Sequence, residues 1–103
     1  MNASEFRTLS YDEKIELMID QPEEIGLPEE ASFVAQYLAQ YRPILPPARH
    51  LDNESSMDIA DTLESVGLIE PKVISRIMKM LGYKLYFQGV PQPVWSMKHI
   101  ESE

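Results

Sequence analysis

Cationic side chains recur at helical spacing in the last third of this chain. Lys72, Arg76 and Lys79 lie four and three residues apart, so they share one face of a helix. A row of ammonium and guanidinium groups binds phosphate, and arginine makes bidentate contacts with phosphate or guanine. The pattern predicts a surface for a polyanion. The candidate contact residues are Lys72, Ser75, Arg76, Lys79, Lys84 and Lys98.

The charges of the chain are separated along its length. From Pro71 to Lys98 there are five basic residues and no acidic one. Residues 1–70 hold four basic and fifteen acidic residues, and the net charge of the whole chain is -8. Non-specific DNA-binding proteins usually carry a basic excess. Any contact with nucleic acid is therefore expected to be local.

The segment from Pro71 to Leu81 must position the cations. On a helical wheel its polar half holds the three cations and Ser75. Its other half holds Val73, Ile74, Ile77, Met78, Met80 and Leu81. Proline favours the first helical position, and glycine at position 82 favours a stop. We predict a helix whose apolar half packs inward and whose polar half suits a DNA major groove.

A first helix is predicted from Tyr11 to Asp20. Ser10 and Glu13 have the spacing of a capping box, and an acidic link follows over residues 23–27. The apolar stripe of this helix exceeds what a small domain covers with ease, so it predicts a surface for a protein partner or a homodimer. The stripe consists of Tyr11, Ile15, Met18 and Ile19.

Two further helices are predicted before the cationic one. The first begins at Pro28 and ends near Arg42, because Pro43 disfavours a helical conformation in the residue before it. Its stripe is Phe33, Val34, Tyr37, Leu38 and Tyr41. An extended connection over 42–53 packs through Ile44, Leu45 and Leu51. The second helix, capped by Ser55 or Ser56, covers 57–66, with an inner face of Ile59, Ala60, Leu63 and Val66.

A β-hairpin is predicted after Gly82. Its strands are Lys84–Gln88 and Val94–Lys98, and a proline-containing loop joins them. Trp95 and Met97 are expected to be the hairpin's share of the core. The alternative is a stacking platform for single-stranded bases, for which Tyr83 and Tyr86 are better placed if they face outward.

Residues Ser55–Lys98 resemble a winged helix-turn-helix domain. The resemblance lies in Val-Ile-Ser-Arg-Ile-Met-Lys-Met-Leu-Gly-Tyr at 73–83 and in a hairpin ending Pro-Val-Trp-Ser-Met at 93–97. Such modules are common in replication and regulatory proteins of phages and mobile elements. The resemblance implies a mainly α fold with a small β-hairpin and an extra N-terminal helix. Residues 1–27 would be an acidic helical arm, and 28–103 the winged-helix domain. The cationic helix face would be the recognition surface for DNA, and residues 89–92 the wing tip.

The sequence contains few residues suited to catalysis. Its two histidines, His50 and His99, lack partners at metal-ligand spacing, and the absence of cysteine excludes disulfides and thiolate metal sites. We expect a non-enzymatic protein without a cofactor or metal. No apolar run has the length of a membrane span, and no signal peptide is expected, so we predict a cytoplasmic protein.

A second function also fits the sequence. The net charge of -8 and the acidic residues Asp58, Asp61 and Glu64 favour an adaptor or inhibitor that keeps the winged-helix fold and binds a basic protein. The two functions differ in the surface they use. DNA binding needs the cationic helix, whereas the adaptor needs the acidic face.

Overall fold

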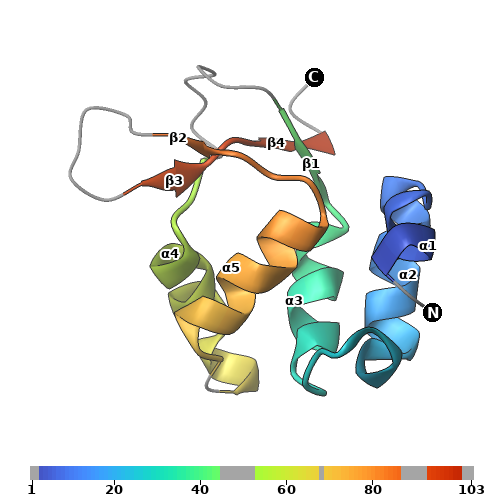
Figure 1. The fold of residues 1–103 in the computed structure, drawn as a ribbon. Coiled ribbons are helices and arrows are strands. Elements are labelled where there is room, and N and C mark those ends of the chain that lie inside the picture. Colours follow the sequence, from blue (N-terminus) through green and yellow to red (C-terminus); the bar gives the residue numbers. More distant parts are fainter. Residues whose placement is uncertain (1–2, 45–52, 68, 87–92, 101–103) are drawn as a thin grey trace.

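The chain folds into short helices with two small antiparallel strand pairs (Figure 1). The computed structural model describes residues 3–44, 53–67, 69–86 and 93–100. The elements are α1 (Ala3–Arg7), α2 (Tyr11–Asp20), η1 (Pro22–Ile25), α3 (Ala31–Leu38), β1 (Tyr41–Pro43), α4 (Ser56–Thr62), η2 (Glu64–Val66), α5 (Pro71–Met80), β2 (Leu85–Tyr86), β3 (Val94–Trp95) and β4 (Met97–His99). The predicted class, mainly α with a small hairpin, is confirmed.

Helix α5 lies between α3 and α4 at the centre of the fold (Figure 1). Proline at its first position and Gly82, whose φ is 91°, delimit it as predicted. Ile74, Ile77 and Met78 are fully buried. The apolar half of the predicted helix therefore forms the middle of the hydrophobic core, and its polar half is directed outward.

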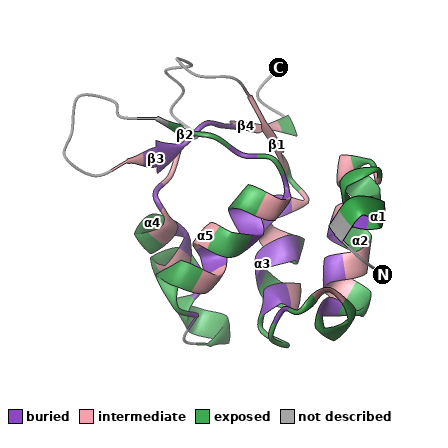
Figure 2. Cartoon of the chain, viewed as in Figure 1, coloured by how far each residue is buried: buried purple, intermediate pink, exposed green. Residues whose placement is uncertain are grey.

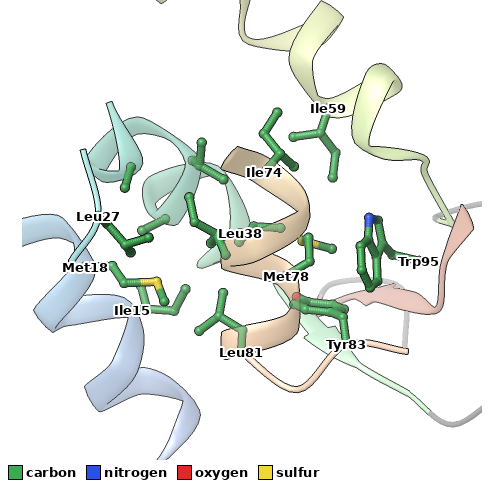
Figure 3. Packing of buried hydrophobic residues seen from close by; sticks show 14 of the residues in the cluster. Ile15, Met18, Leu27, Leu38, Ile59, Ile74, Met78, Leu81, Tyr83 and Trp95 are labelled. Carbon is green, nitrogen blue, oxygen red and sulfur yellow. The ribbon is translucent and has the colours of Figure 1, made fainter. Parts of the chain in front are cut away.

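Helices α1 and α2 belong to the same core as the rest of the chain. Ile15 and Met18 are buried in one cluster with Leu38 and Leu81 (Figure 3). Phe6 of α1 belongs to the same cluster. The predicted partner surface on α2 is therefore wrong for Ile15 and Met18, because α2 packs against α3 and buries them. Tyr11 and Ile19, the other two residues of the stripe, are half-buried against the same cluster.

The predicted start of α2 is confirmed. The Glu13 backbone N–H donates to Ser10 Oγ at 3.2 Å, and the Ser10 N–H donates to Glu13 Oε1 at 3.0 Å. The predicted link over 23–27 is instead mostly helical, because η1 forms one turn of 3₁₀ helix. Gly26 ends that turn with a φ of 75°, a left-handed conformation that favours glycine.

The second predicted helix is shorter than expected at both ends. Residues 28–30 form a turn before α3 begins at Ala31, and the helix ends at Leu38. Residues 41–43 are the strand β1 rather than helix, since Pro43 favours an extended Arg42 and β4 provides a pairing partner. Phe33, expected on the inner face, is 42% exposed.

Helix α4 begins at the predicted cap. Ser55 Oγ accepts from the Asp58 N–H at 3.1 Å, and Asp58 Oδ2 accepts from the Ser55 N–H at 3.0 Å. The α-helix ends at Thr62, and the 3₁₀ turn η2 follows. Val66, predicted to face inward, is 50% exposed because this turn rotates it away from the core. The connection from α4 to α5 is thus longer than the predicted four-residue turn.

The hairpin pairs as predicted, but it is shorter and has a second partner. Leu85 lies opposite Trp95, and Tyr86 lies opposite Val94. The chain changes ladder at Ser96, whose N–H donates to the Lys84 carbonyl while its own carbonyl accepts from the Ile44 N–H. Strand β4 then pairs with β1, so the hairpin is tied to the segment after α3. Leu45, Leu51, Phe87, Gln88 and the wing tip lie outside the described residues.

A shared core predicts that damage in α2 lowers the stability of the distant hairpin. Met18→Ala should reduce the free energy of unfolding by about 2–5 kcal/mol, because it leaves a cavity at a fully buried site. The measurement is urea unfolding followed by fluorescence of Trp95, the only tryptophan. Glu16→Ala, on the exposed face of α2, should change stability by less than about 0.5 kcal/mol. An unchanged Trp95 transition in Met18→Ala would mean that residues 1–27 unfold independently.

Candidate nucleic-acid interface

The three cations predicted on one helix face all lie on the exposed side of α5. Lys72, Arg76 and Lys79 are exposed, and Figure 2 shows exposed segments along the outward side of this helix. Lys72 Nζ lies 3.3 Å from Glu70 Oε2, with the two side chains 83% and 66% exposed. Such a solvent-exposed pair contributes little energy. Lys72 is therefore available to exchange this partner for a phosphate.

Arg76 extends toward the α2–α3 connection. A Cβ atom placed on Gly26 would lie 3.3 Å from Arg76 Nη2. The neighbouring Glu23 and Glu24 of η1 are exposed. The central cation of the row thus lies beside an acidic segment of the same chain, which reduces the positive potential on that side of α5.

Ser75 is engaged inside the chain rather than aligned with the exposed row. Its Oγ lies 2.7 Å from Ser56 Oγ, and Ser56 Oγ accepts from Trp95 Nε1 at 2.9 Å. Ser75 therefore joins α5 to α4 and β3. Its position at the edge of the polar half of the wheel was the sequence signal for this role, but the partners come from segments far away in the sequence.

The two remaining predicted contact residues, Lys84 and Lys98, lie in different parts of the fold. Lys84 is exposed just before β2, where the hairpin begins. Lys98 is half-buried in β4 and lies opposite Arg42 of β1. Arg42, which was not predicted as a site residue, donates to Asp12 Oδ1 at 2.8 Å and lies over the Tyr11 ring. The structure groups Lys72, Arg76 and Lys79, and places Lys98 in a separate ladder.

Tyr83 does not face outward, so it cannot form part of the alternative stacking platform. Its side chain is 3% exposed, and its hydroxyl bonds to the Tyr11 hydroxyl, which donates to the Leu38 carbonyl at 2.9 Å. Burial raises the pKa of Tyr11 to about 12. Burial, and then the nearby Tyr11, raise the pKa of Tyr83 far above its usual range. Trp95 is buried as expected, and the Tyr86 side chain lies outside the described part.

The described residues contain no group of three or more histidine, aspartate or glutamate side chains that could hold a metal ion. His99 Nε2 lies 3.3 Å from Gln40 Oε1, and its ring meets the edge of Tyr41. His50 lies outside the described residues. In the same part of the chain, no helix is long and apolar enough to cross a membrane.

An acidic hollow of about 720 Å³ lies on the side of the molecule formed by α2, η1 and α3. Asp20, Glu23, Glu29 and Glu30 line it, together with the exposed Phe33. The chain thus has an acidic surface with an aromatic side chain as well as the cationic face of α5. The sequence predicted the acidic character of this region but not the exposed Phe33.

Comparisons with protein-family models, with curated proteins and with solved structures found no match to this chain.

The buried tyrosine pair predicts a loss of stability at alkaline pH. Below about pH 10 both phenols are protonated in the folded and unfolded states. Above that pH the unfolded chain loses these protons first, so stability should fall as pH rises from about 10 toward about 12. Urea unfolding between pH 8 and 11 measures this effect. Tyr83→Phe should show a shallower decline, and equal slopes in both proteins would refute the role of the pair.

Proposed function

We propose that α3, β1, α4, α5 and the hairpin form a winged helix-turn-helix domain that binds DNA through α5. The order of these elements and the glycine after α5 support the proposal. The pairing of β4 with β1 supports it as well, because it holds the hairpin beside the cationic helix. The role we propose is a regulatory or replication accessory one, without catalysis.

The main support for the proposal is the row of exposed cations on α5, which lies opposite the fully buried face of this helix. Lys72 and Lys79 are seven residues apart, so they are separated by about 10 Å along the helix axis. This length is comparable with the width of about 12 Å of the DNA major groove. The two lysines can meet phosphates at the groove edges while Arg76 reaches a guanine or a further phosphate.

The remainder of the chain limits the strength of this binding. Its net charge of -8 opposes approach to DNA, and the acidic link beside Gly26 lies next to Arg76. The proposed complex therefore depends on a small number of contacts with good geometry. We expect modest affinity for arbitrary DNA and a preference for sites that engage Arg76.

Charge reversal on α5 should abolish DNA binding without unfolding the protein. We expect Arg76→Glu with Lys79→Glu to remove detectable binding to a mixed-sequence duplex, because two attractive contacts become repulsive. Both side chains are exposed, so circular dichroism should be unchanged. Fluorescence anisotropy with a labelled duplex measures the affinity.

The matched control is Arg7→Glu with Lys14→Glu on α1 and α2, which produces the same net charge. This control should retain most of the affinity. In the natural protein, three phosphate contacts predict a slope of roughly -3 in a plot of log affinity against log salt concentration. Equal affinity in the α5 double variant and the natural protein would rule out this function.

The acidic hollow favours a second function, an adaptor that binds a basic protein. Its carboxylates attract lysine and arginine, and Phe33 offers an apolar contact beside them. Pull-down from a lysate, with and without nuclease treatment, separates the two functions. A partner that survives nuclease but is lost in Phe33→Ser would favour the adaptor. Loss of every partner on nuclease treatment would favour DNA binding.

A further inference from the structure

A small cleft lies where α5, α4 and the hairpin meet. It has a volume of about 210 Å³, and its lining includes Ser56, Met57, Ser75, Lys79, Leu85 and Trp95. Met57 and Leu85 are 55% and 45% exposed, so they form an accessible apolar rim. The cleft thus combines one cation and the hydroxyls of Ser55, Ser56 and Ser75 with an apolar rim, directly beside the cationic row of α5.

The Ser56–Ser75 pair in the cleft has one more hydroxyl proton than its hydrogen bonds use. Trp95 Nε1 donates to Ser56 Oγ, and a single hydrogen bond joins Ser56 Oγ to Ser75 Oγ. Whichever serine donates in that pair, the other keeps its own O–H. Among the described residues, this proton has no acceptor. One donor in the cleft is therefore available to a ligand, next to the ammonium group of Lys79.

The size of the cleft restricts what it can hold. Sites that enclose a small molecule have volumes of about 300–1,000 Å³, and this cleft is smaller. It suits one unit of a polymer that is anchored elsewhere as well. A cation with a hydroxyl donor suits an anionic oxygen, and an apolar rim suits the carbon atoms of a sugar.

We propose that this cleft binds one sugar–phosphate unit of a DNA strand. Lys79 and the spare hydroxyl of the Ser56–Ser75 pair contact the phosphate oxygens, and Met57 and Leu85 pack against the deoxyribose. This inference rests on the proposed function, because it assumes that α5 lies on DNA. It adds a second role for Lys79, which would bind a phosphate between α5 and the base of the hairpin.

Trp95 provides a reporter inside the cleft. It is the only tryptophan, so its indole N–H gives a single resonance in a ¹⁵N-correlated NMR spectrum. Binding of phosphate to the spare hydroxyl should polarise Ser56 Oγ and alter its hydrogen bond with the indole. Titration of the labelled full chain with a short mixed-sequence duplex should shift this resonance together with the backbone amides of α5.

Two variants test the cleft. Ser75→Val narrows the cleft by a methyl group, which should exclude the sugar–phosphate unit even though Ser56 keeps its O–H. Lys79→Gln removes the ammonium group. Each should weaken binding about tenfold, the effect expected for one charge-assisted hydrogen bond. Each should also eliminate the indole shift while the amides near Lys72 still respond. Ser65→Val, on the exposed face of η2, is the control that should keep both the affinity and the indole shift. Lys72→Gln should weaken binding, because it removes a phosphate contact, but keep the indole shift.

The outcomes distinguish this inference from the function on which it rests. Shifts in α5 without an indole shift in the natural protein would overturn the cleft and leave DNA binding intact. An indole shift that persists in Lys79→Gln would also overturn it. Because Lys79 is exposed, this variant should fold, so it tests the cleft even if Ser75→Val does not fold. No shift anywhere on addition of DNA would overturn both proposals.

Discussion

Burial of one half of α5 is the constraint on which the rest of the structure depends. Ile74, Ile77 and Met78 are fully buried between α3 and α4. Full burial of each such side chain contributes about 1.5–3 kcal/mol. A rotation of the helix by one residue would expose part of this surface and bring a cation toward the core, where an unpaired charge is very costly. The hydrophobic core therefore sets the direction in which Lys72, Arg76 and Lys79 point, and no polar contact is needed to orient them.

Two polar connections then fix the neighbours of α5. The Trp95–Ser56–Ser75 hydrogen bonds join the hairpin and α4 to the middle of the helix, and the Tyr83–Tyr11–Leu38 bonds join its end to α2 and α3. Both are partly buried, so loss of one partner would leave an unsatisfied group. The pairing of β4 with β1 completes the arrangement. The hairpin base is thereby held in a defined position relative to the cations, which a surface that binds an extended ligand requires.

The features that were predicted correctly depend on nearby residues. A stretch of about ten residues is enough to predict each of them: the Ser10–Glu13 capping box, Pro71 at a helix start, and the apolar and polar halves of α5. The errors depend on contacts between distant segments. Strand β1 exists because β4 pairs with it, and Tyr83 is buried because Tyr11, 72 positions earlier, accepts its hydrogen bond. For the same reason the α2 stripe seemed available to a partner, and the link between Ser56 and Ser75 was not foreseen. Local patterns identified the candidate cations but not the side chains around them.

The charge distribution determines which contacts can contribute to the proposed complex. At physiological salt, charges interact over a screening length of about 8 Å. This length is shorter than the width of the molecule. In the proposed complex, the distant acidic groups would therefore reduce the rate of approach to DNA more than they would weaken contacts at α5. Close to α5, Arg76 lies beside Gly26 at the end of the acidic turn η1, which would lower the positive potential there in the proposed complex. We therefore expect Arg76 to contribute most where a ligand offers it a bidentate partner. An acidic body with a narrow cationic face would thus discriminate between sites by geometry, because it lacks the general electrostatic attraction that holds a basic protein on any DNA.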